Sequence, residues 1–475
     1  MCNNIKKEGD LNRLLYSRFA NPMSSSSNTS NLQVNSSHKQ ILAIALPISA
    51  SIIVPQINFI TNNIFLGGLG QEALGLAGIT GVFYLIFAVI GHGLNNGLQS
   101  LISRRAGENN IAEIGNLFSQ GIRIALAFSF VGILLTWLVV PALFKFALHD
   151  PLLVDKAVSF LNIRIVGLPL LFVYQMRNAL LVGTNQTRYL IIGTATEAVT
   201  NIFFDYGFIY GKFGMPNLGF NGAAYASIIS EFAGLAVLFV LIHVKGISKQ
   251  FQLFKYWALD WTNIKLILKI SSPIIVQYAI SIISWEFFYI LIEHHGARDL
   301  AVSNTMRNIF GFFGCFTWAF GATANSMVSN LMGQNLNDQV PVVINRIMMW
   351  SAGMAIFVCT ILNIFPVQVL SIYGQGPAFI EAGIPVLRIV SMALVLMSVS
   401  VVWLNSVTGT GNTKVNLYSE FVAIILYCSY VYIVLEHLKL PIEWGWMSEV
   451  IYWVTLFIPS FIYMKSGRWK KLAKY

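Results

Sequence analysis

The chain has 475 residues, of which 56% are hydrophobic and only 11% are charged, and its mean hydropathy is +0.66. Soluble domains carry about 25% charged residues, so this composition excludes an ordinary soluble enzyme, a disordered protein and a nucleic-acid-binding module. The net charge of +10 is what cytoplasmic loops and tails of a membrane protein would supply, and we expect no nucleic-acid partner. The class that remains is an all-α polytopic membrane protein.

Residues 1–39 are polar and rich in Ser and Asn, which predicts a disordered cytoplasmic N-terminal tail. From residue 40 onward, apolar stretches follow one another with short connections, and each is long enough for a membrane helix of ~20 residues. We predict twelve transmembrane helices, with both termini in the cytoplasm and the protein in the cell's inner (cytoplasmic) membrane. The predicted spans are 40–64, 73–102, 116–146, 153–182, 189–211, 219–245, 264–295, 299–330, 341–372, 378–408, 414–436 and 441–464.

The spans divide the chain into two lobes with a linker between them and a short tail after them. The N-lobe is 40–245, the cytoplasmic linker 246–263, the C-lobe 264–464 and the basic cytoplasmic tail 465–475. Lysines and tryptophans in the linker predict an amphipathic helix on the membrane surface. Even-numbered connections are basic and odd-numbered ones neutral or acidic, so the even-numbered connections are expected in the cytoplasm.

The two lobes match each other at a fixed offset of 226 residues. Pro47 pairs with Pro273, Gly107 pairs with Gly333, and the segment GTNQTR from Gly183 pairs with GTGNTK from Gly409. An offset of six spans predicts parallel repeats, related by an axis along the membrane normal. Two pseudo-symmetric six-helix bundles with a cleft between them are typical of an alternating-access transporter.

The fifth span carries an unusual polar stripe. Glu197, Asn201 and Asp205 follow at i, i+4 and i+8, so they share one helical face. Ionisable residues inside a bilayer are costly and usually functional. A carboxylic acid in a partly dry cavity can exchange a proton near neutral pH. We therefore predict a cation or proton site at Asp205, with Asn201 and Glu197 as further members.

A second acid, Glu286, lies in the middle of the seventh span in the run SWEFFYILIE. An acid among aromatic residues suits an amphipathic cationic solute, through charge attraction and cation–π contacts. We predict that Glu286 binds substrate together with Trp285, Phe288 and Tyr289, and with Gln56 of the polar first span. The first span also carries Asn58, Asn62 and Asn63, which either join the coupling site or hydrogen-bond neighbouring helices.

Other intramembrane polar residues carry weaker signals. Glu231 and Glu420 lie nearer the cytoplasmic side and are either structural or part of an inner vestibule. His92 reads as a helix-packing residue. The four cysteines form no CxxC motif and the histidines no ligand ladder, so we expect no metal site and no cofactor other than a coupling ion.

Several motifs follow one another in a fixed order: ALP ending at Pro47 with FLGGLGQEALG, NIFFDYGFIYG from Asn201, GKFGMPNLGFNGAAYAS from Gly211, the two GT-containing segments, and AVSNTMRN followed by ANSMVSNLMGQN. In these motifs the sequence resembles the multidrug and toxic compound extrusion (MATE) family of efflux transporters over residues 40–464. The resemblance implies two six-helix lobes in a V shape. It also implies export of organic cations or other amphipathic compounds in exchange for H⁺ or Na⁺, by a protein that we expect to act as a monomer in the lipid bilayer.

The resemblance also suggests site residues. Asn201 and Asp205 match the Asn-x-x-x-Asp pattern of the family's fifth helix, which is implicated in cation coupling, and Glu286 looks like its seventh-helix Glu. The family's first-helix Asp falls on Asn62, which leaves the first lobe without a two-carboxylate site unless Glu197 compensates. The tenth span has no acid near Met397, which weakens a sodium cage in the second lobe.

Two other functions compete with drug export. A flippase for a lipid or lipid-linked glycan would have more spans and a cationic cleft, whereas this chain has twelve predicted spans and an acidic cleft. A membrane-embedded lipid-modifying enzyme would need a paired-Asp metal motif or a His–Asp cluster at the membrane surface, and the sequence contains neither. Secondary active export is therefore the leading prediction, with H⁺ favoured over Na⁺.

Overall fold

The computed structural model describes residues 32–147, 150–253 and 255–472. The chain divides into two units, residues 1–32 and 33–475, and every described helix lies in the second unit. Residues 1–31, which make up most of the predicted tail, lie outside the described residues.

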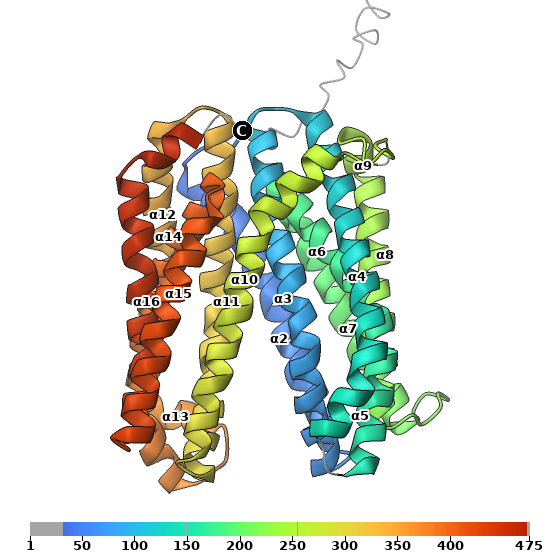
Figure 1. The fold of residues 1–475 in the computed structure, drawn as a ribbon, viewed down its shortest axis with the longest axis vertical. Helices are drawn as coiled ribbons and strands as arrows, with labels where there is room; N and C mark the ends of the chain where they lie inside the picture. The colour runs from blue at the N-terminus through green and yellow to red at the C-terminus, as the bar shows by residue number, and fades with distance from the viewer. Residues whose placement is uncertain (1–31, 148–149, 254, 473–475) are drawn as a thin grey trace, which may run out of the picture. The chain divides into compact units, whose positions relative to one another are not determined.

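Each of the twelve predicted spans is helical (Figure 1). The first half consists of α2 (His38–Gly67), α3 (Gln71–Gly107), α4 (Ile111–Ala147), α5 (Pro151–Arg164), α6 (Leu168–Gly183), α7 (Leu190–Tyr210) and α8 (Phe220–Val244). The second half consists of α10 (Trp261–Glu293), α11 (Ala297–Gly333), α12 (Val340–Ile364), α13 (Pro366–Ser371), α14 (Pro377–Thr410), α15 (Thr413–Val431) and α16 (Ile442–Lys465). A four-residue α9 (Ile247–Gln250) lies between the halves.

Two of the predicted spans contain breaks. The fourth comprises α5 and α6, joined by a 3₁₀ turn at Ile165–Gly167 and followed by Pro169. The ninth ends at Ile364 because Pro366 lacks an amide hydrogen and disfavours helical backbone at Phe365, so the chain restarts as α13. Membrane length therefore predicts the spans well, while proline sets their internal breaks.

Ten of the described helical segments are long and apolar enough to cross a membrane, and α7 and α11 fall outside this criterion. The sequence explains the exceptions. The predicted acidic stripe lowers the hydropathy of α7, and α11 is rich in Asn, Ser and Thr. Most of the residues in the second half of α11 are buried, so protein surrounds these polar groups and lipid does not.

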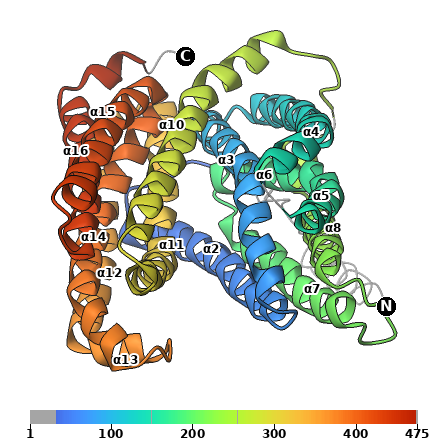
Figure 2. The same ribbon diagram turned by 60° about the horizontal axis from the view of Figure 1, so that its bottom comes forward.

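The helices of residues 33–475 form two bundles (Figures 1 and 2). In the first bundle α3 packs on α4 and α6, and α7 packs on α2 and α8. In the second bundle α14 packs on α11, α12 and α16, and α15 packs on α10 and α16. The bundles meet where α10 and α11 lie against α3, and where α11 lies against α2. These four helices therefore form the interface between the bundles.

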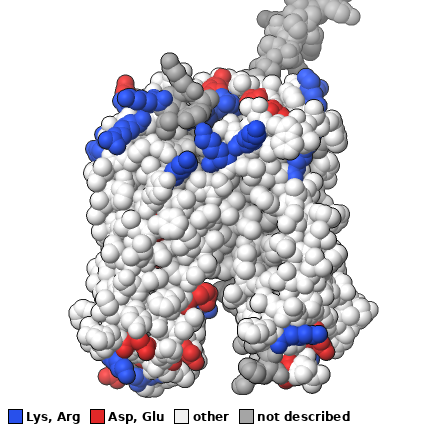
Figure 3. All heavy atoms as spheres, in the orientation of Figure 1, with Lys and Arg blue, Asp and Glu red and all other residues white. Residues whose placement is uncertain are grey.

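Charge distinguishes the two ends of the bundles. Lys and Arg gather at the end where α3 and α11 finish, which we call the basic end (Figure 3). At the opposite end the surface is hollowed between the two bundles. The bundles are therefore closed at the basic end and open at the other.

Closure at the basic end uses reciprocal contacts between α3 and α11. The Gln99 side chain donates to the Ala322 carbonyl at 2.8 Å, and the Asn325 side chain donates to the Asn96 carbonyl at 3.1 Å. Residues 96 and 99 correspond to 322 and 325 at the offset of 226, so each contact is the symmetry mate of the other. The hydroxyl pairs Ser100–Ser329 and Ser103–Ser326 are related in the same way, at 3.4 and 2.8 Å.

Two glycines allow the helix ends to approach this closely. A Cβ atom on Gly107 would lie 2.0 Å from the Asn330 carbonyl oxygen, and one on Gly333 would lie 2.2 Å from the Arg104 carbonyl oxygen. Both contacts are with backbone, which cannot swing aside. The paired glycines that marked the repeat in the sequence therefore form a backbone-to-backbone contact at the closed end.

Residues 33–37 precede α2 and are held in place across this closed end. The Val34 amide donates to the Asn330 side chain at 3.0 Å, the Gln334 side chain donates to the Val34 carbonyl at 2.9 Å, and the Val34 side chain is buried. Arg346 of α12 donates to the Ser36 carbonyl at 2.6 Å. The predicted disordered tail therefore does not extend to residue 39, because its last residues satisfy polar groups of both bundles.

The linker differs from the predicted amphipathic helix. Within 246–263 the described helices are the four-residue α9 and the first residues of α10, and Phe251 and Leu253 bury their side chains. Asp260 ends the linker by capping α10, accepting from the Thr262 and Asn263 amides at 3.0 and 3.2 Å. The Asn116 side chain also donates to Asp260 and holds the pKa of that carboxyl below its usual range. Contacts with α4 therefore shape the linker more than its own pattern does.

Candidate functional site

The polar stripe of α7 faces the protein interior, as its spacing predicts. Asp205 is 0% exposed and Asn201 is 1% exposed, while Glu197 is partly buried. Neither carboxylate oxygen of Asp205 has a hydrogen-bond partner among the described residues, and the Asn201 side chain is also unpaired. Buried polar groups are nearly always paired. A carboxyl and an amide that both lack partners are therefore suited to receive a proton or a cation.

Two hydrogen bonds set the height of these residues relative to α2. Thr187 donates to the Ala43 carbonyl at 3.3 Å, and the Tyr210 hydroxyl donates to the Phe65 carbonyl at 2.6 Å. The partners are 144 and 145 residues apart in the sequence, so α2 and α7 run parallel in constant register. This register places Asp205 level with residues 60–61, and Asn201 level with 56–57.

The polar residues of α2 therefore lie at the height of the α7 stripe. Asn58 and Asn62 each have a buried, unpaired side-chain oxygen, and both are within about one helical turn of the level of Asp205. Gln56 is half-buried at the level of Asn201. On α6, further buried oxygens of Tyr174, Gln175 and Asn178 also lack partners. The N-lobe thus contains polar atoms on three helices that have no described protein partner.

Glu197 has different surroundings from Asp205. It lies within electrostatic reach of Arg164 and Glu231. Arg164 binds both oxygens of Glu231, at 2.5 and 3.2 Å, and lies 4.0 Å above the Tyr84 ring. Arg164 at the end of α5 and Glu231 of α8 form a buried pair, which gives Glu231 the structural role that was one of its two predicted readings. Glu197 is therefore next to a fixed ion pair, whereas Asp205 has no ion-pair partner among the described residues.

Glu286 lies on the face of α10 that turns toward the other bundle. That face meets α3 at Ile275, where a Cβ on Gly93 would lie 2.4 Å from the Ile275 side chain. Glu286 follows Ile275 by eleven residues, about three helical turns, and so lies on the same side of α10. It is half-buried and has no ion-pair partner among the described residues. The carboxylate thus lies where the two bundles separate.

The predicted aromatic neighbours of Glu286 do not all share its face. Phe288 is 0% exposed and packs edge-on against Tyr427 and Trp446. Tyr289 is 8% exposed and donates its hydroxyl to the Ser303 carbonyl at 2.9 Å. Both belong to the core of the second bundle: Phe288 lies about 200° around the helix from Glu286, and Tyr289 turns its hydroxyl toward α11. Trp285 is half-buried at the edge of that core.

The sequence-based prediction missed Glu449 of α16, which is 4% exposed. Its carboxylate accepts from Trp453 at 3.2 Å and from Tyr427 at 3.4 Å. The criterion that selected Glu286, an acid among aromatics inside a span, also applies to the run WGWMSEVIYW that contains Glu449. His92, expected to pack between helices, is instead exposed, with its ring 6.4 Å from that of Tyr278.

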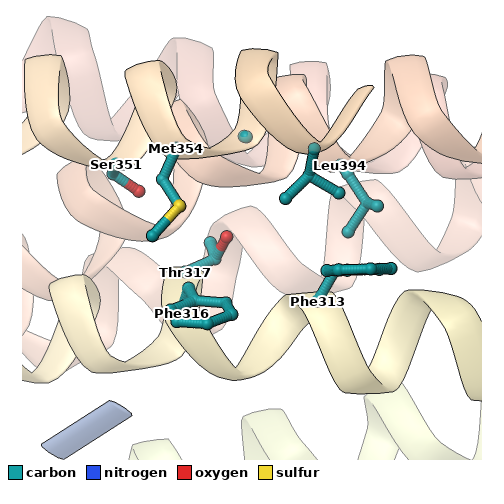
Figure 4. Close-up of a pocket in the computed structure, with 8 residues that line it drawn as sticks. Phe313, Phe316, Thr317, Ser351, Met354 and Leu394 are labelled. Carbon is teal, nitrogen blue, oxygen red and sulfur yellow. The ribbon is translucent and has the colours of Figure 1, made fainter. Parts of the chain in front are cut away.

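A cavity of about 260 Å³ lies at the basic end, and the positive charges of Arg104, Lys269 and Lys414 in its lining do not suit an organic cation. Across residues 32–147, 150–253 and 255–472, no three His, Cys, Asp or Glu side chains cluster as metal ligands. A crevice among Phe313, Thr317, Met354 and Leu394 lies between α11, α12 and α14 (Figure 4). It has room for about 10 Å³, which is barely enough for one water molecule. The polar residues between and inside the bundles are therefore the better candidates.

Comparison with known proteins agrees with this architecture. The MatE family model matches the chain twice, at residues 47–207 and 273–433. The matches begin and end 226 residues apart, which is the offset found in the sequence.

Curated relatives and solved structures cover most of the chain. A probable multidrug resistance protein NorM of Thermotoga maritima is 23% identical over 92% of this chain and 94% of its own length. Another NorM, from Neisseria meningitidis serogroup A, is 22% identical over 80% of this chain and 79% of its own. A structure described as the outward-facing conformation of a multidrug resistance MATE family transporter has a TM-score of 0.86 at 18% identity, covering 95% of this chain and all of that one. The chain is therefore a multi-pass membrane protein and not an enzyme, and it belongs to the MATE family of multidrug efflux transporters.

Proposed function

We propose that this protein is a secondary antiporter that exports organic cations and related amphipathic compounds in exchange for protons. Lys and Arg gather at the basic end (Figure 3). The positive-inside rule places such residues in the cytoplasm, so the basic end faces the cytoplasm. The hollow between the bundles then opens outward. The protein works as a monomer, since each chain supplies both bundles.

The observation that carries the proposal is Asp205, a fully buried acid in a membrane helix with neither oxygen paired. An isolated carboxylate is expensive in a medium of low dielectric constant. Its charge is relieved by a proton, by a bound cation, or by a rearrangement that admits water. Each of these three ways of relieving the charge favours a different arrangement of α2 and α7. Occupancy of Asp205 therefore biases the equilibrium between the outward-open and inward-open states.

Substrate cations reach Glu286 from the cytoplasm in the inward-open state and leave through the hollow in the outward-open state. Because both ligands act on one two-state equilibrium, proton binding at Asp205 favours release of the drug to the outside. Asn201, Asn58 and Asn62 supply hydrogen bonds around Asp205 and do not titrate. Glu197, next to the Arg164–Glu231 pair, contributes negative charge to the electrostatic field around Asp205.

The test is dye uptake by inverted vesicles under separate proton and sodium gradients. Asp205→Asn should abolish uptake driven by a proton gradient, while binding of ethidium to the purified protein remains measurable. The matched control is Glu293→Gln, an exposed acid at the end of α10. Uptake by Asp205→Asn at the wild-type rate would overturn the site, and uptake that responds only to sodium would overturn the choice of proton.

A further inference from the structure

The second bundle contains a buried acid, Glu420 of α15, whose setting differs from that of Asp205. Glu420 is 0% exposed. One carboxylate oxygen accepts from the Tyr452 hydroxyl at 2.6 Å, and the other accepts from the Gln277 side-chain amide at 3.1 Å. Both donors are uncharged. A carboxylate held only by neutral donors in a protein interior remains under pressure to bind a proton.

The residues around Glu420 enclose it closely and carry no positive charge, which favours a proton over a larger cation as its ligand. Tyr278 and Tyr452 are the titratable groups that face it from α10 and α16, and Glu449 lies beyond Tyr452 on α16. The acid and base of α14, Glu381 and Arg388, lie in the part of that helix far from the basic end. The Gln277 side chain beside Glu420 is only 4% exposed. The site is thus too enclosed for an organic cation.

The position of Glu420 connects it to the interface between the bundles. Gln277 is followed on α10 by Tyr278, whose hydroxyl accepts from the Asn96 side chain of α3 at 2.8 Å. Adjacent residues of α10 therefore bond to Glu420 in one direction and to the opposite bundle in the other. The His92 ring of α3 lies 6.4 Å from the Tyr278 ring, which places Tyr278 at the contact between the two bundles.

We propose that Glu420 is a second proton-binding site, which transmits its occupancy through Gln277 and Tyr278 to the α10–α3 contact. A proton from water in the gap forms an O–H bond on the Glu420 oxygen that faces Gln277. Two donors then face each other, and the Gln277 amide turns so that its oxygen accepts. The reverse step returns the proton to water. The inference rests on the proposed antiport, to which it adds a site in the second lobe.

The experiment uses the full chain in nanodiscs and follows protonated carboxyl groups by infrared difference spectroscopy across a pH titration. Glu420→Gln should remove one titrating carboxylic acid band. Tyr452→Phe keeps the acid but removes a donor to its anion, so the band should persist with its midpoint moved toward higher pH, by about tenfold in proton affinity. The Tyr452 variant keeps the proposal testable if Glu420→Gln does not fold.

A second measurement tests the link to conformation. Spin labels at Leu152 and Ile372, exposed residues at the end opposite the basic end, report the separation of the bundles. The distance should change with pH in the wild type. Glu420→Gln, which mimics the protonated acid, should reduce that change by about half, if Asp205 and Glu420 contribute equally. Glu293→Gln, at an exposed acid on α10, is the matched control and should leave the pH response intact.

The outcomes separate this inference from the proposed function. If Glu420→Gln leaves both the infrared titration and the pH-dependent distance unchanged, Glu420 is not a proton site, and antiport through Asp205 stands. If Glu293→Gln reduces the pH response as much as Glu420→Gln does, the assignment to Glu420 is wrong. If the wild type shows no ion-driven dye uptake but the Glu420 band titrates, the proposed antiport fails and the proton site remains.

Discussion

Buried charge takes two forms in the first bundle. Arg164 and Glu231 neutralise each other, with both carboxylate oxygens bonded. Breaking such a pair leaves an uncompensated charge and is strongly destabilising, which makes the pair a fixed part of the structure. Asp205 has no such partner among the described residues and can change its charge without disrupting an ion pair. We therefore propose that Asp205 takes part in coupling, whereas Glu231 stabilises the fold.

Glu286 should matter most for charged substrates. Glu286→Gln removes a negative charge at the gap while keeping the shape of the side chain. Binding of a monovalent cationic dye should weaken by ~1–2 kcal/mol if the pair is partly desolvated. Titration of the purified variant with ethidium, followed by fluorescence, measures this change.

A neutral amphipathic ligand is the control for that experiment, because its affinity should change little. Equal losses for the charged and neutral ligands would mean that Glu286 supports the structure of the gap and does not attract cations.

The sequence predicted the environment of some individual site residues but not of others. The burial of Asn201 and Asp205 followed from helical spacing alone. The core positions of Phe288 and Tyr289 did not, because the direction of each side chain depends on which neighbours α10 meets. The partners of Glu420 and the exposure of His92 likewise depend on contacts between helices that are far apart in the sequence.

Among the elements, α3 and α11 decide whether the basic end can close. Their contact relies on small residues and hydroxyl groups, so that the two backbones touch at Gly107 and Gly333. Interfaces between membrane helices are often built in this way, because small side chains allow close approach. Substitution at these glycines should therefore affect conformation more than it affects either proposed binding site.

Gly333→Ala should disfavour the closed basic end. The added Cβ would lie 2.2 Å from the Arg104 carbonyl oxygen, and overpacking of this kind typically costs about 1–3 kcal/mol. Cysteines placed at Ser103 and Ser326, whose hydroxyl oxygens are 2.8 Å apart, should form a disulfide readily in the unsubstituted protein. The cross-linking yield should fall clearly once Gly333→Ala is added.

Gly311→Ala on the same helix is the matched control, since nothing lies within 4 Å of a Cβ atom at that position. It should leave the cross-linking yield unchanged. An equal fall for both variants would point to a general effect on α11.

For the whole molecule, the order and number of helical spans followed from the sequence, but the breaks in the fourth and ninth spans did not. Apolar stretches of membrane length separated by polar turns leave few alternatives, and the offset of 226 residues matches the double family match. The linker was wrong as an amphipathic helix because packing of Phe251 against the first bundle was not visible in its pattern. The packing of α10 and α11 against α2 and α3 likewise joins helices that are far apart in the sequence. The periodicity of each helix alone does not predict which helices meet.

The orientation of the molecule in the membrane can be tested directly. Lys249 in the linker and Lys470 after α16 are both exposed and should both face the cytoplasm. Single cysteines at these positions should resist a membrane-impermeant reagent in intact cells and react after permeabilisation. Ready labelling of either position from outside would reverse or break the proposed topology.

The reciprocal contacts between α3 and α11 also bear on how the two halves of the chain divide their tasks. The Gln99–Ala322 and Ser100–Ser329 contacts each recur between the equivalent residues of the other half. The acids do not follow this symmetry: Asp205 corresponds to Val431, Glu420 to Thr194 and Glu286 to Ile60. Closure of the basic end therefore depends on both halves alike, whereas each buried acid belongs to one half only. The two halves share the work of closing the molecule and divide the work of sensing charge.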